Sequence, residues 1–296
     1  MSTTLTLYSP SGVLLRAAPL RLAAKRLREQ GYTVRLDDSA LVKHQRFAGD
    51  DDVRLAAIHR VADEAPGIAM ASRGGYGLTR LLDRIEWKRV ARSVEQGTRW
   101  VGYSDLTALQ MGLLAHTGAG SWCGPLAADD FGREVLDEVT PDCFHEAMSG
   151  ELEAVGFRTE TGFDGLQASG VLWGGNLTVL CSLLGTSHWP VVKGGILFVE
   201  DVNEHPYRVE RMLLQLAQAG VLKGQKAVLL GAFSDWRPSP MDRGYTMRSA
   251  VACVRQATKA PVLTGFPFGH VSSKVTVPFG RKVRLLVDGR DALLGW

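Results

Sequence analysis

The feature that most constrains the fold is the alternation of short apolar runs with helix-forming segments over the first third of the chain. The apolar runs are 5–8, 32–36, 67–71 and 99–102, and the helical segments are 18–30, 50–61, 78–85, 87–94 and 106–116. The run 67–71 is short and continuously apolar, as a parallel strand buried on both faces would be. The alternation predicts a doubly wound parallel sheet, in which ligands bind beyond the carboxyl ends of the strands.

Ser104 follows one of these strands, within the stretch Arg99-Trp-Val-Gly-Tyr-Ser-Asp-Leu-Thr-Ala-Leu109. A serine on a bend between a strand and a helix projects its hydroxyl from the sheet beside helix amides, as a nucleophile does. The G-x-S-x-G pattern is incomplete, because Leu106 stands where the second glycine would be. The alternative is that Ser104 or Asp105 caps the helix that begins at Leu106.

The glycine run Ser72-Arg-Gly-Gly-Tyr-Gly77 also follows a strand. It does not complete a G-x-G-x-x-G dinucleotide motif, because Arg80 occupies the third glycine position, and no phosphate-binding G-x-x-x-x-G-K-[ST] is present. Two interpretations remain: a turn that needs glycine only for its backbone shape, or a loop whose bare amides approach a reacting oxygen as an oxyanion hole.

The pattern changes after Gly124-Pro125. We expect a first domain over 1–128, a connector over 129–168 that is helical and broken at Pro141, and a second, strand-rich domain over 169–296. No internal repeat or low-complexity segment interrupts this division.

A serine nucleophile needs a base, and the base needs an acid that orients it. Of the seven histidines, His270 has the best context, since it lies in a loop directly after a strand, Gly265-Phe-Pro-Phe-Gly-His270, stiffened by Pro267. Glu200 ends the most apolar strand of the second half, so its carboxylate needs a partner. That partner is either the base or an arginine, Arg208 or Arg211.

Bulk properties exclude several classes of protein. The net charge is only +3 with scattered lysines and arginines, so no nucleic acid partner is expected. No apolar run reaches the roughly 18 residues of a membrane span. The four cysteines are far apart, so neither a metal site nor a disulfide framework is expected. The chain does not open with a signal peptide, which favours the cytoplasm.

The chain resembles the LD-carboxypeptidase (muramoyltetrapeptide carboxypeptidase) family of serine peptidases, nearly end to end. The shared motifs are Ser9-Pro-Ser-Gly12, Arg73-Gly-Gly-Tyr-Gly77, Gly102-Tyr-Ser-Asp-Leu-Thr-Ala-Leu109, Gly124-Pro125, Gly174-Gly-Asn-Leu177, Leu183-Leu-Gly-Thr186, Phe198-Val-Glu-Asp-Val-Asn-Glu-His-Pro-Tyr-Arg208 and Phe268-Gly-His270. Several motifs in the right order are far more specific than any one of them.

The resemblance implies an α/β protein with a flavodoxin-like parallel sheet in its N-terminal domain and a β-rich, barrel-like C-terminal domain, with the site at their junction. It places the nucleophile at Ser104, the acid at Glu200 and the base at His270. The oxyanion donors fall on the backbone amides of Asp105 and Gly75. It also implies a cytoplasmic homodimer that needs no cofactor or metal.

The implied reaction removes the terminal D-alanine of a murein tetrapeptide, from an amide with an L-centre of the diaminopimelate type, during peptidoglycan recycling. A carboxypeptidase must hold a free carboxylate, for which Arg73, Arg80 and Arg208 are candidates. The substrate-binding candidates also include Tyr76, Asn176 and Glu204. For most of these residues the alternative is a structural role, as an ion pair or a helix cap.

Two other functions remain open at this point. One is a related immunity peptidase that cleaves peptidyl or aminoacyl-nucleotide antibiotics with the same triad. The other is a non-catalytic protein that binds a ligand on the same sheet without turning it over.

Overall fold

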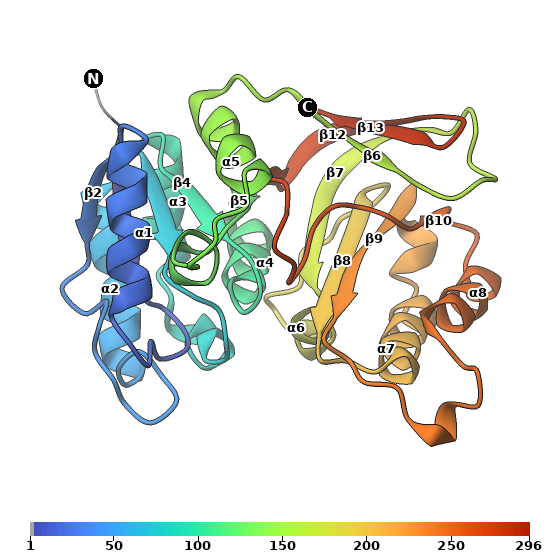
Figure 1. Cartoon of the computed structure of the whole chain (residues 1–296), viewed down its shortest axis with the longest axis horizontal. Coiled ribbons are helices and arrows are strands. Elements are labelled where there is room, and N and C mark those ends of the chain that lie inside the picture. Colours follow the sequence, from blue (N-terminus) through green and yellow to red (C-terminus); the bar gives the residue numbers. More distant parts are fainter. Residues whose placement is uncertain (1–2) are drawn as a thin grey trace. The chain divides into compact units, whose positions relative to one another are not determined.

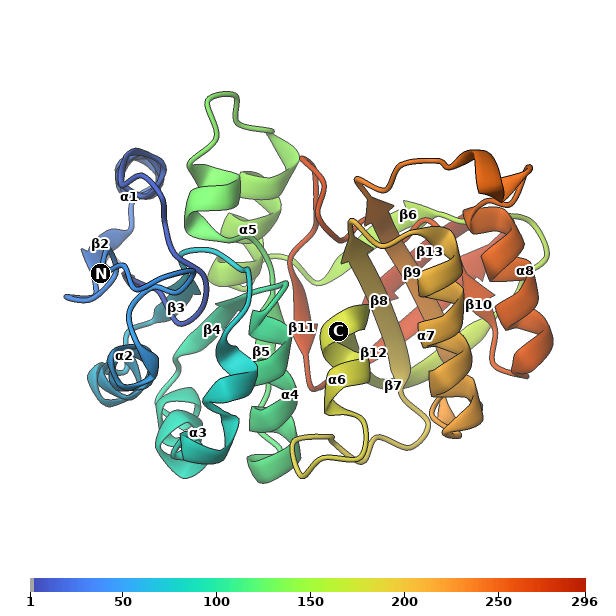
Figure 2. The same ribbon diagram turned by 90° about the horizontal axis from the view of Figure 1, so that it is seen from below.

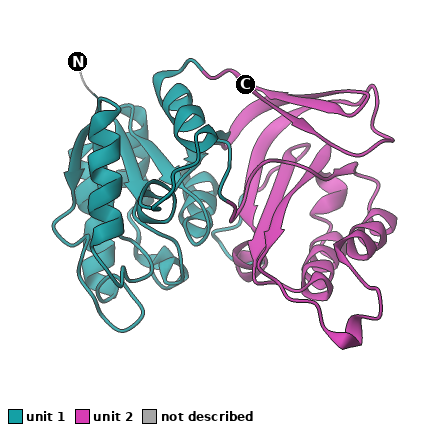
Figure 3. Cartoon of the chain, in the orientation of Figure 1, with its two compact units in different colours: residues 1–151, 185–190, 272–278 teal, residues 152–184, 191–271, 279–296 magenta. Residues whose placement is uncertain are grey.

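The computed structural model describes residues 3–296, and the chain forms two compact units. Unit 1 consists of the residues up to 151 together with 185–190 and 272–278, and unit 2 consists of 152–184, 191–271 and 279–296 (Figure 3). The expected connector 129–168 therefore contributes to both units, and the domain limits drawn from the sequence remain a prediction.

The first sheet is the doubly wound parallel sheet that the alternation predicts. Its strands are β1 (Thr4–Tyr8), β2 (Thr33–Leu36), β3 (Ile68–Ala71), β4 (Arg99–Gly102), β5 (Ser121–Cys123) and β11 (Val277–Phe279). The spatial order is β11-β5-β4-β3-β1-β2, and the pairings among β1 to β5 are all parallel. The order of β1 to β5 is that of flavodoxin-like folds, so this part of the expected fold class is confirmed.

Helices cover both faces of this sheet. They are α1 (Ala18–Glu29), α2 (Asp51–Glu64), α3 (Trp87–Glu95), α4 (Leu106–Thr117) and α5 (Val139–Ser149). Figure 2 shows α1 and α5 on one side of the sheet and α2, α3 and α4 on the other. Because both faces are covered, every residue of β3 is buried.

Local chemistry explains where these helices begin. The Asp50 carboxylate accepts a hydrogen bond from the Val53 amide at 2.8 Å and so caps α2. In α1, Pro19 stands in the first turn, where its missing N–H removes no helical hydrogen bond.

Two expectations for helices were wrong in detail. The segment 78–85 forms two short 3₁₀ turns, Leu78–Arg80 and Leu82–Arg84, in place of one helix. Pro141 does not break a helix, because it lies in the first turn of α5, where proline is tolerated.

Unit 2 is built on a mixed sheet. Its strands are β6 (Ala154–Arg158), β7 (Gln167–Asn176), β8 (Ile196–Val202), β9 (Ala227–Ser234), β10 (Val262–Leu263), β12 (Arg281–Asp288) and β13 (Asp291–Gly295). The order is β10-β9-β8-β7-β12-β13-β6, parallel from β10 to β7 and antiparallel from β7 to β6. The sheet curls along this order (Figure 1), which confirms the β-rich, barrel-like second part of the fold class.

Three helices belong to the parallel half of this sheet: α6 (Leu177–Leu183), α7 (Pro206–Gln218) and α8 (Met247–Ala257). Each parallel connection runs through one of them, β7-α6-β8, β8-α7-β9 and β9-α8-β10. Glu200 lies in β8, and His270 lies in the loop after β10, so both belong to this half. Within residues 3–296, no helix combines the length and the apolar character needed to cross a bilayer.

Candidate active site

Ser104 occupies a strained bend between β4 and α4. Its φ is +64°, in the left-handed region that non-glycine residues rarely adopt and that recurs at functional sites. The Ser104 side chain packs against the backbone of Gly74, since a Cβ at position 74 would lie 2.6 Å from the Ser104 Oγ. The bend expected from the sequence is therefore present, and the glycine run closes directly over the serine.

Asp105 stands at the N-cap position of α4, but its side chain makes no capping hydrogen bond. The carboxylate, in a residue only 2 % exposed, instead accepts hydrogen bonds from the Ser11 hydroxyl and, at 3.0 Å, from the Leu78 amide. Burial raises the pKa of Asp105, an effect that these two hydrogen bonds and the charge of Arg54 partly oppose. The alternative that Asp105 caps the helix is wrong.

The glycine run has two structural reasons for its composition. At Gly74 the neighbouring Ser104 leaves no room for a side chain. At Gly77, φ is +148°, and a Cβ would lie 2.5 Å from the Arg54 guanidinium. Between them Gly75 is exposed, so its amide, a predicted oxyanion donor, lies in the part of the run that solvent reaches.

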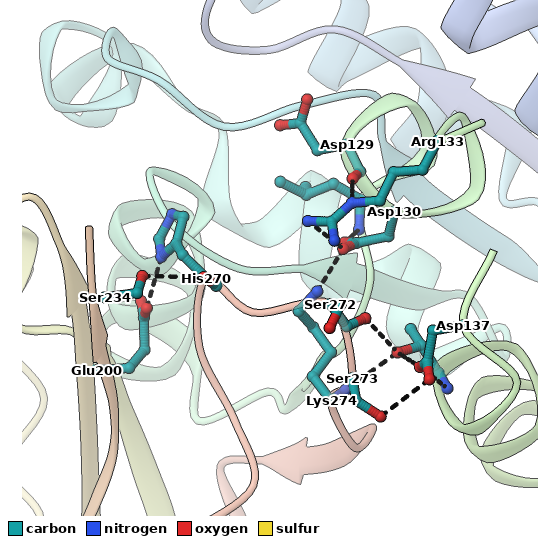
Figure 4. A network of polar contacts seen from close by, with 12 residues as sticks. Asp129, Asp130, Arg133, Asp137, Glu200, Ser234, His270, Ser272, Ser273 and Lys274 are labelled. Atoms are coloured by element: carbon teal, nitrogen blue, oxygen red, sulfur yellow. Dashed lines mark hydrogen bonds and ion pairs between the residues drawn. The ribbon is translucent and has the colours of Figure 1, made fainter. Parts of the chain in front are cut away.

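The other two predicted catalytic residues meet within unit 2. The Nδ1 atom of His270 lies 2.6 Å from the Oε2 atom of Glu200, whose residue is 0 % exposed (Figure 4). An ionised carboxylate only accepts hydrogen bonds, so this contact places the imidazole proton on Nδ1 and leaves Nε2 as the basic nitrogen. Of the partners considered for Glu200, a histidine base or an arginine, the structure thus contains the histidine, His270.

A break in strand pairing orients Glu200. The register of β8 against β9 shifts between Val199 and Asp201, so that Glu200 lies at an irregularity of the kind that re-aims a side chain. Opposite it, the Ala232 amide donates to the Phe268 carbonyl at 2.8 Å and ties down the loop that carries His270.

Two polar side chains hold this pair from either side. Asn176 donates its Nδ2 to Glu200 at 3.3 Å and to Asp201 at 2.9 Å. The Ser234 hydroxyl donates to the main-chain carbonyl of His270 at 2.9 Å (Figure 4). Sequence reasoning missed Ser234, which lies in no shared motif.

Asn176 also accepts a hydrogen bond from the Val179 amide at 3.1 Å, so it both caps α6 and contacts the proposed acid. The helix-cap alternative is therefore correct for this residue, and its role in binding substrate stays a prediction.

The candidates for binding the substrate carboxylate have mixed surroundings. Arg73 donates to the Val13 carbonyl at 2.7 Å, and Arg80 pairs with Asp51 at 2.7 Å. Arg208 lies 3.7 Å from Glu204.

Tyr76 is 45 % exposed, with its ring beside the Arg46 guanidinium. Among these candidates, Asn176 contacts a predicted catalytic residue, Glu200.

The chain that follows His270 enters unit 1 at Ser272. Lys274, fully buried, pairs with the buried carboxylate of Asp130 and lies 5.1 Å from the centre of the Tyr103 ring. The Lys274 amide and the Ser272 carbonyl both bond the Thr140 hydroxyl, at 3.0 and 3.1 Å. Figure 4 shows the pairing of Lys274 with Asp130. Together these contacts fix the segment four residues after the histidine.

Across residues 3–296, no three His, Cys, Asp or Glu side chains gather in an arrangement that could hold a metal ion.

Two family models match the chain. Residues 5–124 match the LD-carboxypeptidase N-terminal domain, and residues 169–285 match the LD-carboxypeptidase C-terminal domain. A probable murein peptide carboxypeptidase of Bacillus subtilis is 31% identical, over 96% of this chain and 90% of its own length.

Solved structures are similar over almost the whole chain. A muramoyltetrapeptide carboxypeptidase from Oxalobacter formigenes has a TM-score of 0.90 and 39% identity, covering 99% of this chain and 98% of its own. MccF in complex with glutamyl sulfamoyl guanosine has a TM-score of 0.87 at 20% identity, covering 100% of this chain and 96% of its own. At that identity the likeness to MccF concerns the fold alone.

Proposed function

Because the chain belongs to the LD-carboxypeptidase family, a family of peptidases, we propose that it is a serine carboxypeptidase acting on murein tetrapeptides. The bond cleaved is the amide between an L-centre of the diaminopimelate type and the terminal D-alanine, in the recycling of peptidoglycan. The names of the relatives from Bacillus subtilis and Oxalobacter formigenes support this substrate class.

In the proposed mechanism, His270 accepts the proton of the Ser104 hydroxyl while the serine oxygen attacks the scissile carbonyl carbon. Glu200 holds the imidazole by Nδ1 and stabilises the imidazolium that forms. The amides of Asp105 and Gly75 receive the negative oxygen. His270 then gives its proton to the departing D-alanine nitrogen, and a water molecule, activated by the same imidazole, releases the acyl group from Ser104.

The observation that carries this proposal is the 2.6 Å contact between His270 and the fully buried Glu200. A buried carboxylate bonded to one imidazole nitrogen makes the other nitrogen a general base. The strained φ of Ser104 supports the choice of nucleophile, because such strain persists where the surrounding structure enforces it.

The test is mass spectrometry of a defined murein tetrapeptide incubated with the protein. We expect release of D-alanine, and we expect Ser104→Ala to abolish it while the circular dichroism spectrum stays unchanged. D-alanine release by Ser104→Ala at the wild-type rate would refute the triad.

Parallel incubation with an aminoacyl sulfamoyl adenosine tests the immunity-peptidase function. Faster turnover of that compound than of the tetrapeptide would replace the proposed substrate. Labelling of Ser104 by a serine-directed phosphonate would exclude a protein that binds without turnover.

The resemblance also leads us to propose a cytoplasmic homodimer that needs no cofactor. Size-exclusion chromatography with light scattering tests the dimer, and cell fractionation tests the location. Activity that is lost with a chelator and restored by zinc would contradict a metal-independent triad.

A further inference from the structure

The Asp105 carboxylate connects three separate loops of unit 1. It lies directly after Ser104, accepts the hydroxyl hydrogen bond of Ser11 in the loop after β1, and accepts the amide of Leu78 at the end of the glycine run after β3. Strands β1, β3 and β4 are neighbours in a parallel sheet, so their carboxyl ends share one edge. One buried side chain therefore joins the loops that follow β1, β3 and β4.

The backbones of these loops touch without intervening side chains. The Gly12 amide donates to the Gly74 carbonyl at 3.1 Å, and a Cβ at position 12 would lie 2.7 Å from that carbonyl oxygen. Gly74 in turn packs against Ser104. With no side chains as spacers, the separation between the glycine run and the serine depends on the hydrogen bonds that join the loops.

The glycine run is held at two points on either side of Gly75. Gly74 is held by Gly12, and Leu78 is held by Asp105. Gly75 itself has a φ of +113° and is exposed, and what lies against it is the backbone of Gly12, with no side chain between them. Loss of the hydrogen bond from the Leu78 amide to Asp105 would release the part of the run between Gly75 and the 3₁₀ turn Leu78–Arg80.

A buried cation lies beneath the same loop. Arg54 is 0 % exposed, donates to the Pro10 carbonyl at 3.1 Å and pairs with Asp51. Its guanidinium faces the backbone of Gly77, and its charge acts on Asp105. The carboxylate thus sits beside a fixed positive charge, with both hydrogen bonds directed at its Oδ2 atom.

We propose that the Asp105 side chain is a positioning residue, which sets the distance between the Gly75 amide and the Ser104 hydroxyl. This role rests on the proposed function and differs from the role of the Asp105 backbone amide. The carboxylate does not act as a helix cap either, because it accepts no hydrogen bond from the first amides of α4. Its effect falls on the step in which negative charge develops on the substrate oxygen, so it changes kcat and leaves KM nearly unchanged.

The experiment compares Asp105→Ala with Asp105→Asn in the tetrapeptide assay. Alanine removes the acceptor, and a misplacement of about 1 Å costs about 100-fold, so we expect kcat to fall by roughly 30- to 100-fold at constant KM. Asparagine keeps one oxygen that can accept both hydrogen bonds, so we expect it to restore kcat to within about 5-fold of wild type. The rate of labelling by a serine-directed phosphonate should fall in parallel with kcat.

Ser11→Ala is the second variant, for the case in which Asp105→Ala does not fold. It removes one of the two donors and should lower kcat by about 3- to 10-fold with KM unchanged, within the range that follows from a partial misplacement. Ser93→Ala is the matched control, because Ser93 is equally buried in unit 1 and bonds the Trp100 indole at 2.9 Å, away from these loops. It should lower the melting temperature and leave kcat unchanged.

Wild-type kcat in folded Asp105→Ala, or in Ser11→Ala if Asp105→Ala does not fold, would overturn the positioning role. So would an Asp105→Asn variant as inactive as the alanine variant, since the acceptor would then not be what matters. Ser104→Ala is assayed beside them: its full activity would overturn the proposed function and this role with it. An inactive Ser104→Ala beside an unaffected Asp105→Ala would overturn the role alone.

Discussion

The ion pair between Lys274 and Asp130 predicts a large loss of stability when one partner is removed. Both side chains are almost fully inaccessible, 0 % and 2 % exposed, so neither charge is hydrated in the folded state. In Lys274→Met the Asp130 carboxylate keeps the Leu126 amide at 2.8 Å and Arg133 at 3.8 Å as its partners. Arg133 is itself 39 % exposed, so its charge compensates only weakly.

Breaking a buried pair on one side costs about 3–5 kcal/mol, because the remaining charge stays buried without its partner. For a unit of this size each kcal/mol lowers the melting temperature by about 2–4 °C, so we expect a fall of roughly 6–20 °C. The double variant Lys274→Met/Asp130→Asn buries no net charge and should recover at least half of the loss. Urea denaturation at neutral pH measures the free energy of unfolding of wild type, Lys274→Met, Asp130→Asn and the double variant.

Lys25→Met is the matched control. The Lys25–Glu29 pair has the same chemistry at 3.7 Å, with side chains 72 % and 60 % exposed, and its loss should cost less than about 1 kcal/mol. An effect of Lys274→Met no larger than that of the control would refute the argument from burial. A double variant as unstable as the sum of the single variants would refute the argument from charge compensation.

Three further predictions concern the site and the pH dependence of folding. Gly74→Ala brings a carbon to 2.6 Å from the Ser104 Oγ, so kcat should fall by about 100-fold. Gly224→Ala is the control, because its Cβ meets open space, and it should keep wild-type kcat. Equal kcat in both variants would contradict the packing of Gly74 against Ser104. Glu200→Gln keeps the shape but disturbs the imidazole tautomer, so kcat should fall by about 10³- to 10⁴-fold with little change in KM, and a fall below 10-fold would exclude Glu200 as the orienting acid. Burial alone would raise the pKa of Asp37, but hydrogen bonds from Arg60 and Ser39 hold that pKa below its usual value of about 4. This lowered pKa stabilises the folded state above about pH 4, and the contribution, roughly 1–3 kcal/mol, is lost as the pH falls through the folded-state pKa. Denaturation curves between about pH 3 and pH 7 should therefore show a smaller acid-induced loss in Asp37→Asn than in wild type, and identical losses would contradict it.

The fold of unit 1 could be predicted largely because its signals are local. Continuous apolar runs marked β3 and β4, and Gly31 with Pro19 marked the ends of α1 within one or two residues. The 3₁₀ turns at 78–84 could not be predicted, because the Leu78 amide bonds Asp105, twenty-seven residues away, and no local pattern records that contact.

The same distinction applies to the site. Ser104, Glu200 and His270 each stand at the end of a strand or just beyond it, where the residue type alone raises the question of chemistry. The resemblance paired Glu200 with His270, seventy residues further along the chain, but no sequence pattern predicted the shift in strand register at which Glu200 lies. The carboxylate of Asp105 was overlooked for a different reason: at an N-cap position, aspartate has a sufficient local explanation, and only the coordinates exclude it.

The fixed segment 272–278 has a consequence for biosynthesis. Strand β11 begins within it and forms the edge of the first sheet, beside β5, although about 150 residues separate the two along the chain. A ribosome therefore releases most of unit 1 long before the strand that finishes its sheet, and before the lysine that neutralises Asp130. Until residues 272–278 have been synthesised, the first sheet lacks its edge strand β11 and remains accessible to chaperones.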